Sequence, residues 1–242
     1  MTSGYDALKS QIKPFDLIFF IGGEKISSTI RFIQRVSLGV ENKLEVWSHV
    51  GLVVTRDLLD DKRLEPGKLY LIESTLSGKF NDGIKNVDGK SFFGVQIRDL
   101  DQLVKKYAGK KKRGIAWSRL HNNPFRLTSQ TEDGLLKQKE IQFAFTTVWP
   151  IRWEGIRYNF NLISLAASVW PAFKPLDWLL LKFDFLNTDD WLFCSELVFD
   201  ILQVFKFYDK HIDASSVLPQ DFLGYDNSTP GIPCIFDDPI RL

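Results

Sequence analysis

The sequence is poor in the residues that build disulfide frameworks and zinc sites. Its 242 residues include two cysteines, Cys194 and Cys234, and three histidines. Two cysteines cannot form the disulfide network of a small secreted domain, so we expect both thiols to be reduced, with Cys234 buried. Because the spacing of cysteines and histidines matches no zinc motif, we expect neither a catalytic metal nor a cofactor.

An excess of charge of one sign is also absent. Lys and Arg total 31 and Asp and Glu total 30, which leaves a net charge of +1. No global field therefore attracts nucleic acid or an anionic membrane. The one concentration of basic residues, Lys105–Arg113, is either a solvated loop or a surface for peripheral contact with anionic lipid or nucleic acid.

Long hydrophobic runs are missing as well. The longest uncharged stretch, between Arg157 and Lys174, has 16 residues and is interrupted by two asparagines and a proline. A bilayer span requires about 20 apolar residues. The first residues contain no basic segment followed by an apolar run, so we expect no secretory signal peptide and a cytoplasmic location.

What is present predicts one folded α+β domain over residues 1–242. Hydrophobic residues make up 44% and charged residues 25%, which is typical of globular proteins. Short apolar runs bounded by turn or charged residues predict five or six strands. The candidates are Phe15–Ile21, Val46–Val54, Leu69–Ser74 and, more weakly, Phe92–Ile97 and Ile115–Leu120.

Helical spacing and capping residues predict the helices between and after these strands. They are Glu24–Ser37, Asp99–Tyr107, Thr131–Val148 and about Asp190–Phe207. The charged segment 57–68 is interpreted as a solvated connection between two strands. Residues 99–150 are interpreted as including an insertion, and residues 209–242 as an irregular C-terminal wrap.

Cys194 lies near the start of the last predicted helix, in the sequence WLFCSELV. At a helix N-terminus the backbone N–H groups and the positive end of the dipole stabilise a thiolate and can donate to an oxyanion. Cys194 is therefore a candidate nucleophile. Taken alone, it also fits a small buried apolar side chain, and that alternative stays open.

A nucleophilic cysteine needs a base, which in turn needs an orienting group. His49 lies inside an apolar predicted strand, where an imidazole without a partner is costly. Glu73 ends an apolar run in the next predicted strand and can hold the imidazole in one tautomer. Each alone also fits a structural polar group, but with Cys194 they predict a triad that meets at one point. His121 and His211 lie in polar surroundings and are predicted at the surface.

Six short motifs follow one another along the chain. They are Asp16–Phe20, Ser48–Val53, Tyr70–Ser74, Arg157–Phe160, Cys194–Val198 and Leu218–Phe222. Their order resembles the circularly permuted NlpC/P60 papain-like superfamily, and most of all the branch with the bacterial YiiX-type proteins and their relatives in poxviruses and other large DNA viruses. The resemblance covers roughly residues 14–223, with long unmatched stretches between the motifs.

The resemblance implies a papain-like fold, with an antiparallel sheet or half-barrel packed against helices and the nucleophile at a helix N-terminus. It implies Cys194 as nucleophile, His49 as general base and Glu73 as the residue that orients it. In this family the histidine strand precedes the cysteine helix, as it does here. The family has Gly-Asp before its first strand, where this chain has Phe15-Asp16.

Substrate contacts are expected from three aromatic residues near these motifs. The resemblance matches Tyr158 to an aromatic position near the site, and we expect Trp47 and Trp191 to bind substrate as well. The aromatic-rich segment Trp170–Phe193, directly before the nucleophile, either lines an apolar pocket or packs in the core. A pocket there would favour a lipid or acyl substrate.

The function implied is that of a cysteine hydrolase, such as a thiol protease or amidase, or of an acyltransferase. It would act on an amide, ester or thioester bond of a peptide-like or acyl-lipid substrate through a thioester intermediate. The alternative is a structural or interaction protein that keeps the fold without catalysis. Such a protein would be a component of a large DNA virus particle, in contact with other viral structural proteins.

Overall fold

The computed structural model of the 242-residue chain describes residues 3–21, 47–75, 84, 86–89, 94–108, 114–126, 131–158, 191–224 and 232–242. The helix expected at residues 24–37 and most of the aromatic segment 170–193 lie outside these ranges. Residues 109–113 of the basic run do as well.

One eight-stranded sheet forms the centre of this α+β fold. The strand order is β7-β6-β4-β3-β2-β1-β5-β8, and all neighbours are antiparallel except β6 and β7. The bounds are β1 (Leu17–Ile21), β2 (His49–Thr55), β3 (Leu69–Thr75), β4 (Gly94–Asp99), β5 (Gly114–Ser118), β6 (Arg157–Tyr158), β7 (Trp191–Leu192) and β8 (Ile240–Arg241). The α+β class and the five predicted strands are confirmed; the three two-residue strands at the sheet edges were not predicted.

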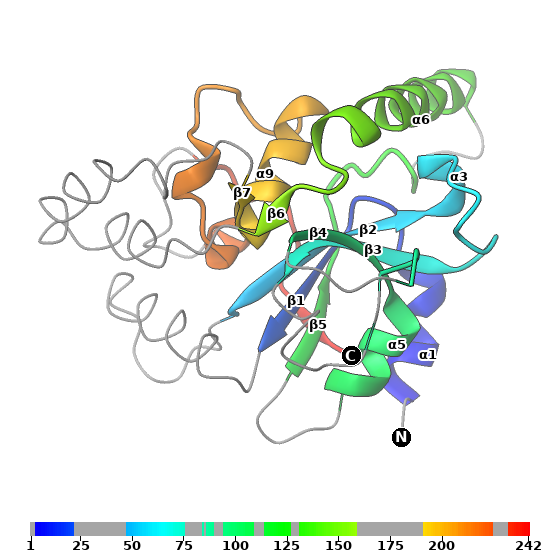
Figure 1. Cartoon of the computed structure of the whole chain (residues 1–242), viewed down its shortest axis with the longest axis vertical. Coiled ribbons are helices and arrows are strands. Elements are labelled where there is room, and N and C mark those ends of the chain that lie inside the picture. Colours follow the sequence, from blue (N-terminus) through cyan, green and yellow to red (C-terminus); the bar gives the residue numbers. More distant parts are fainter. Residues whose placement is uncertain are drawn as a thin grey trace, which may run out of the picture.

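Helices cover both faces of this sheet. On one side lie α6 (Glu132–Arg152), α9 (Cys194–Val204) and the short α3 (Arg56–Leu59). On the other lie α1 (Ser3–Leu8) and α5 (Leu100–Tyr107), as Figure 1 shows. Because both faces are buried, the central strands read as almost continuous apolar runs in the sequence.

Alternate residues of each strand enter two separate hydrophobic cores. The core under α6 and α9 contains Leu17, Phe19, Val50, Leu52, Ile72, Val95 and Ile97 from the strands. The core under α1 and α5 contains Ile18, Phe20, Val53, Leu71, Ile115 and Trp117. A register slip of one residue would exchange these two sets, so the register of the sheet is strongly specified.

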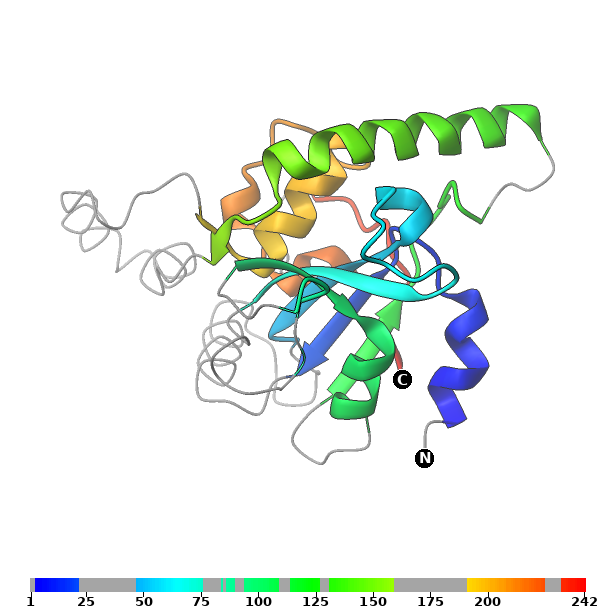
Figure 2. The same ribbon diagram turned by 45° about the vertical axis from the view of Figure 1, so that its right-hand side comes forward.

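The two middle helices begin at capping residues visible in the sequence. The Asp99 carboxylate accepts a hydrogen bond from Gln102 N at 3.1 Å, and Thr131 Oγ1 accepts one from Gly134 N at 3.3 Å. Such caps satisfy backbone donors that have no partner within the helix. Helix α6 runs over α3 and ends beside α9, where Arg152 forms an ion pair with Asp200 at 2.6 Å (Figure 2).

Helix α9 begins later than the sequence pattern predicts. The acidic Asp189-Asp190 pair indicated a start near residue 190, but the helix begins at Cys194. Trp191 is engaged in β7, where it pairs with Arg157 of β6, so this segment is extended. The first turn is closed by Glu196, which accepts a hydrogen bond from Phe193 N at 3.1 Å.

Residues 99–150, interpreted as including an insertion, contain β5, which lies inside the sheet between β1 and β8. Two other expectations about connecting segments need correction. The connection 57–68 is not wholly solvated, since α3 buries Leu58 and Leu59 against the core. The tail contains η4 (Ala214–Ser216), η5 (Pro219–Leu223) and β8, and Cys234 within it is exposed rather than buried, because this stretch lies on the surface.

The chain enters β1 through a residue in an unusual conformation. Phe15 has φ of 70°, in the left-handed region that favours glycine. Its ring is fully buried and packs against Phe125, Phe145 and Phe205, with ring centroids 5.3 to 5.8 Å away. The aromatic core of this side chain stabilises a backbone conformation that would otherwise be unfavourable.

Asp16, next in the chain, fastens β1 to β5 and the turn after it. Its carboxylate accepts hydrogen bonds from Trp117 Nε1 at 2.8 Å, Leu120 N at 3.2 Å and Asn123 Nδ2 at 3.1 Å, and it pairs with Arg126. Burial nevertheless raises the pKa of Asp16, because desolvation outweighs these partners. Asp16 therefore has a structural role in this fold.

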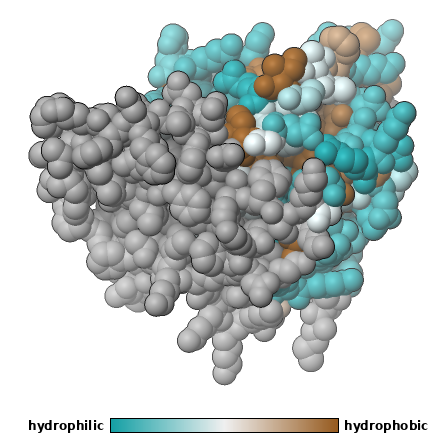
Figure 3. All heavy atoms as spheres, in the orientation of Figure 1, coloured by the Kyte–Doolittle hydropathy of each residue, from teal (hydrophilic) through white to brown (hydrophobic). Residues whose placement is uncertain are grey.

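The described surface is mostly hydrophilic in the view of Figure 3, with hydrophobic atoms gathered near α6. Large exposed hydrophobic side chains on this helix are Leu135, Leu136, Phe143 and Ile151. No helix in the described ranges is long and apolar enough to cross a membrane.

Gly51→Ala should destabilise the protein. A Cβ at this position would lie 2.7 Å from the Leu71 side chain and 3.0 Å from the carbonyl oxygen of Ile72, so the buried Leu71 must move. We expect a loss of about 1–3 kcal/mol in the free energy of unfolding, measured by urea denaturation. Gly4→Ala is the control, because nothing lies within 4 Å of its added Cβ. Equal stabilities for the two variants would contradict this packing.

Candidate active site

Three neighbouring strands place polar side chains on one face of the sheet. His49 is the first residue of β2 and pairs with Phe20 of β1. In the next pair of strands Glu73 lies opposite Gln96, and Leu71 lies opposite Arg98. By strand alternation Glu73 and Arg98 share the face of Leu71 and are diagonal neighbours, within reach of long side chains.

Helix α9 brings Cys194 to the start of β2. The helix packs against β2 and β3, and Cys194 is its first residue, with 5% of its surface exposed. Because His49 is the first residue of its strand, the first turn of the helix can reach its ring. Cys194 is close enough to His49 to be one of the groups that raise the pKa of its imidazole. The structure thus brings Cys194, His49 and Glu73 together.

The contacts of the imidazole define which nitrogen faces the sulfur. His49 Nε2 lies 2.5 Å from Glu73 Oε2, so Nδ1 is the nitrogen left for Cys194. The other carboxylate oxygen, Glu73 Oε1, accepts a hydrogen bond from Arg98 Nη1 at 2.6 Å. The His49 side chain is 20% exposed, whereas those of Glu73 and Arg98 are each 2% exposed. The site is therefore open at His49 and closed behind it.

The protonation of His49 follows from these neighbours. Burial alone lowers the pKa of an imidazole, because it disfavours the charged form. Here the charges of Cys194 and Glu73, and the hydrogen bonds to both, outweigh burial and raise the pKa of His49 to about 10. At neutral pH the arrangement favours an imidazolium between two groups that can be negatively charged.

Aromatic packing also restrains the imidazole. The Phe20 ring lies 5.5 Å from the His49 ring, centroid to centroid, and Tyr107 packs edge-on against Phe20 at 5.0 Å. A ring held on one side by Phe20 and at one nitrogen by Glu73 has little freedom to rotate. This pre-organisation is what a general base requires.

The segment Val217–Asp221 ties the cysteine helix to the histidine strand. Ser195 Oγ donates to the carbonyl oxygen of Val217 at 2.6 Å, and Gln220 Nε2 donates to that of Trp47 at 3.1 Å. Asp221 stabilises the segment itself by accepting a hydrogen bond from Leu218 N at 2.7 Å. Residues next to the nucleophile and next to the base are thus held by one short stretch of chain.

The three expected substrate-binding aromatic residues have different settings. Trp47 is 1% exposed and packs against Phe19, so its side chain belongs to the core. The backbones of Tyr158 and Trp191 lie in the adjacent strands β6 and β7, and β7 leads to Cys194. Their side chains are outside the part of the chain that the structure describes.

Arg98 is the site residue that the sequence reading missed. The sequence pattern that points to Arg98 lies within β4, where the polar Gln96 and Arg98 alternate with the apolar Val95 and Ile97. A buried arginine in a strand calls for an acidic partner, and Glu73 is such a partner one strand away. The other two histidines are at the surface, as predicted, with His121 paired to Asp237 at 2.7 Å.

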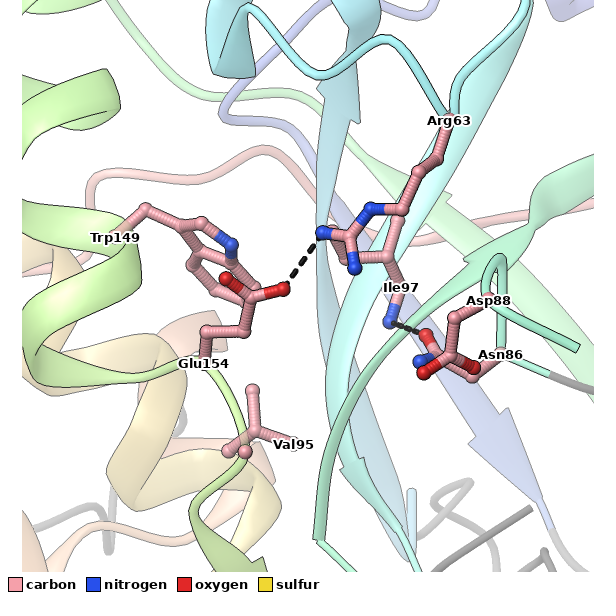
Figure 4. A pocket seen from close by; sticks show the side chains of 8 residues that line it. Arg63, Asn86, Asp88, Val95, Ile97, Trp149 and Glu154 are labelled. Atoms are coloured by element: carbon pink, nitrogen blue, oxygen red, sulfur yellow. Dashed lines mark hydrogen bonds and ion pairs between the residues drawn. The ribbon is translucent and has the colours of Figure 1, made fainter. Parts of the chain in front are cut away.

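A separate pocket lies on the opposite face of β4, between α6 and the turn at residues 86–89 (Figure 4). It holds about 340 Å³ of space open to solvent. Its lining residues are Arg63, Asn86, Asp88, Val95, Ile97, Trp149, Glu154 and Gly155. Arg63 bridges it by pairing with Glu154 at 2.6 Å. Its lining contains none of Cys194, His49 and Glu73, so it is distinct from the candidate active site.

Comparisons with known proteins assign no function to this site. Models of known protein families and curated protein sequences yield no match to this chain. Among the residues that the structure describes, no three His, Cys, Asp or Glu side chains cluster as a metal ion requires. The arrangement of Cys194, His49 and Glu73 is therefore the main observation about function.

The titration of His49 can be measured directly. In a His121→Gln/His211→Gln background His49 is the only histidine, so its ring signals in NMR are unambiguous. We expect the imidazolium to persist far above the ordinary pKa of about 6.5 and to titrate near pH 10. Cys194→Ala should lower this pKa, because the cysteine is one of the groups that raise it. Titration near 6.5 in the background protein would contradict the described contacts.

Proposed function

We propose that the protein is a cysteine-dependent acyl-transfer enzyme, a hydrolase or an acyltransferase. Cys194 is its nucleophile, His49 its general acid and base, and Glu73 the residue that orients the imidazole. The observation that carries the proposal is one set of contacts. The first residue of a helix is a cysteine that interacts with a histidine, and one ring nitrogen of this histidine is held by a buried carboxylate.

In the first half of the reaction the sulfur of Cys194 attacks the carbonyl carbon of an amide, ester or thioester. As the S–C bond forms, the carbonyl electron pair moves to oxygen. Backbone N–H groups of Cys194 and Ser195, in the first turn of α9, are suited to stabilise this oxyanion. His49 then donates its Nδ1 proton to the leaving amine, alcohol or thiol, and the bond to that group breaks.

The second half regenerates the thiol from the Cys194 thioester. Water, or another acceptor, attacks the thioester carbonyl while neutral His49 takes its proton at Nδ1. The S–C bond breaks, and the electron pair returns to the sulfur. Water as acceptor makes the protein a hydrolase, and an alcohol, amine or thiol makes it an acyltransferase.

The fold proposed for this chemistry is the permuted papain-like one. Support comes from the chain order of base, carboxylate and nucleophile, and from Phe15. Phe15 adopts the left-handed conformation at the position where the similar family has glycine. The Leu218–Phe222 motif also has a physical role here, because Gln220 within it binds the backbone next to His49.

The substrate class proposed is a peptide-like amide or an acyl-lipid. The aromatic-rich segment before Cys194 in the sequence favours a substrate with an apolar acyl part. The exposed side of His49 supports access for a leaving group, because its side chain is 20% exposed, whereas those of Glu73 and Arg98 are each 2% exposed.

Thiol labelling tests the proposal with an internal reference. At about pH 6 an ordinary thiol is almost wholly protonated and reacts slowly with iodoacetamide. Cys234 is free and exposed, so its alkylation provides a reference rate in the same molecule. We expect Cys194 to be alkylated about tenfold faster than Cys234 despite its burial, as measured by peptide mass spectrometry.

His49→Ala should remove this advantage, whereas His211→Ala should leave it unchanged, because His211 is fully at the surface. If Cys194 reacts no faster than Cys234, or reacts equally in His49→Ala, a structural role without catalysis is favoured instead.

Accumulation of an acyl-enzyme is a second expected result. With p-nitrophenyl esters of short and long fatty acids, intact mass spectrometry after acid quench should show one added acyl group. Hydroxylamine should remove it, as expected of a thioester, and Cys194→Ala should not acquire it. A stronger signal with long chains would support an acyl-lipid substrate, and equal signals would favour peptide-like amides. Acylation that persists in Cys194→Ala would contradict the assignment of the nucleophile.

A further inference from the structure

Glu73 is a carboxylate buried inside a sheet, and its two oxygens have different partners. Oε2 lies 2.5 Å from His49 Nε2, and Oε1 lies 2.6 Å from Arg98 Nη1. Both Glu73 and Arg98 are 1% exposed, so water cannot compensate either charge. The two residues come from neighbouring strands, β3 and β4, whose register places them diagonally.

The ionisation of Glu73 decides what His49 can do. A carboxylate accepts a proton from Nε2–H, which leaves the lone pair of Nδ1 free to take a proton from Cys194. A neutral carboxylic acid would instead donate to Nε2, so the ring proton of a neutral imidazole would sit on Nδ1. In that tautomer His49 could not act as a base toward Cys194.

Burial by itself favours the second, inactive arrangement. Desolvation penalises the charged form of a carboxyl group and can raise its pKa by several units. A buried Glu73 with only a histidine beside it would therefore tend to be neutral. A fixed cation is needed to keep it ionised, and a guanidinium remains charged at all physiological pH values.

We propose that Arg98 is a positioning residue of the active site, which keeps Glu73 ionised and aimed at His49 so that Nδ1 faces Cys194. This rests on the function proposed above and adds to it the group that sets the protonation of the base. In this proposal Arg98 acts through Glu73, with which it pairs at 2.6 Å.

The electrostatics of the described residues agree with this role. On Glu73 the charges of Arg98 from β4 and His49 from β2 outweigh burial, and they hold its pKa below the ordinary value. On His49 the acting groups are Cys194 from α9 and Glu73 from β3. Arg98, Glu73 and His49 thus form a row of groups with alternating charge, in which Glu73 lies between the two cations and is stabilised in its charged form by both.

The test compares Arg98→Lys, which keeps a charge, with Arg98→Gln, which keeps a hydrogen-bond donor but not the charge. In the His121→Gln/His211→Gln background, NMR reports the tautomer and pKa of His49, and iodoacetamide reports the reactivity of Cys194. For Arg98→Gln we expect the His49 pKa to fall by about 1–3 units and alkylation of Cys194 at about pH 6 to slow tenfold or more. Arg98→Lys should recover most of both.

A second arm separates this role from a merely structural one. Glu73→Gln is made alone and together with Arg98→Gln, and unfolding in urea is followed for each variant. If Arg98 acts through Glu73, then adding Arg98→Gln to Glu73→Gln should leave the His49 titration unchanged. An Arg98 that only stabilises the sheet would lower stability but leave the His49 titration as in the parent protein, and this outcome would overturn the proposal.

The two proposals fail in different ways. If Cys194 shows no enhanced reactivity in the parent protein, the proposed function fails, while the titration of His49 still reports on Arg98. If Cys194 is reactive and Arg98→Gln changes neither its reactivity nor the His49 titration, the function stands and Arg98 has no positioning role. Should Arg98→Gln prove unfolded, Glu73→Gln decides, because a His49 titration unchanged in that variant would show that Arg98 cannot act through Glu73.

Discussion

A carboxylate buried in the middle of a β-sheet is the constraint that organises this protein. Glu73 cannot remain charged there without partners, and its partners come from the strands on either side, His49 from β2 and Arg98 from β4. Both contacts exist only in one register of three strands. The ion-pair geometry and the alternation of apolar residues between two cores therefore specify the same pairing.

The same constraint explains why the candidate site is assembled from distant parts of the chain. The sheet supplies the imidazole and the carboxylate, helix α9 supplies Cys194, and the segment around Gln220 connects the two. Helix α9 covers one face of the sheet, while Glu73 and Arg98 occupy the other. Contact between them is made at the start of β2, where His49 is the first residue of the strand.

Local sequence patterns predicted the elements whose causes are local. Apolar runs identified the five longer strands, and Asp99 and Thr131 were visible as helix caps. The start of α9 was misplaced because pairing of β7 with β6 overrode the acidic capping signal, and the surface position of Cys234 depends on the tail's path. Arg98 was also missed for a non-local reason, because its partner Glu73 lies on the neighbouring strand. The papain-like class and the catalytic function stay predictions.

Dependence on several segments also gives the cysteine a diagnostic property. In an unfolded or partly folded chain Cys194 has neither a helix turn before a sheet nor an imidazole beside it, and so it is chemically equivalent to any other thiol. On the function proposed above, only the completed tertiary structure makes Cys194 react faster than Cys234. The ratio of the two alkylation rates would then measure the native fraction of a preparation, independent of any substrate.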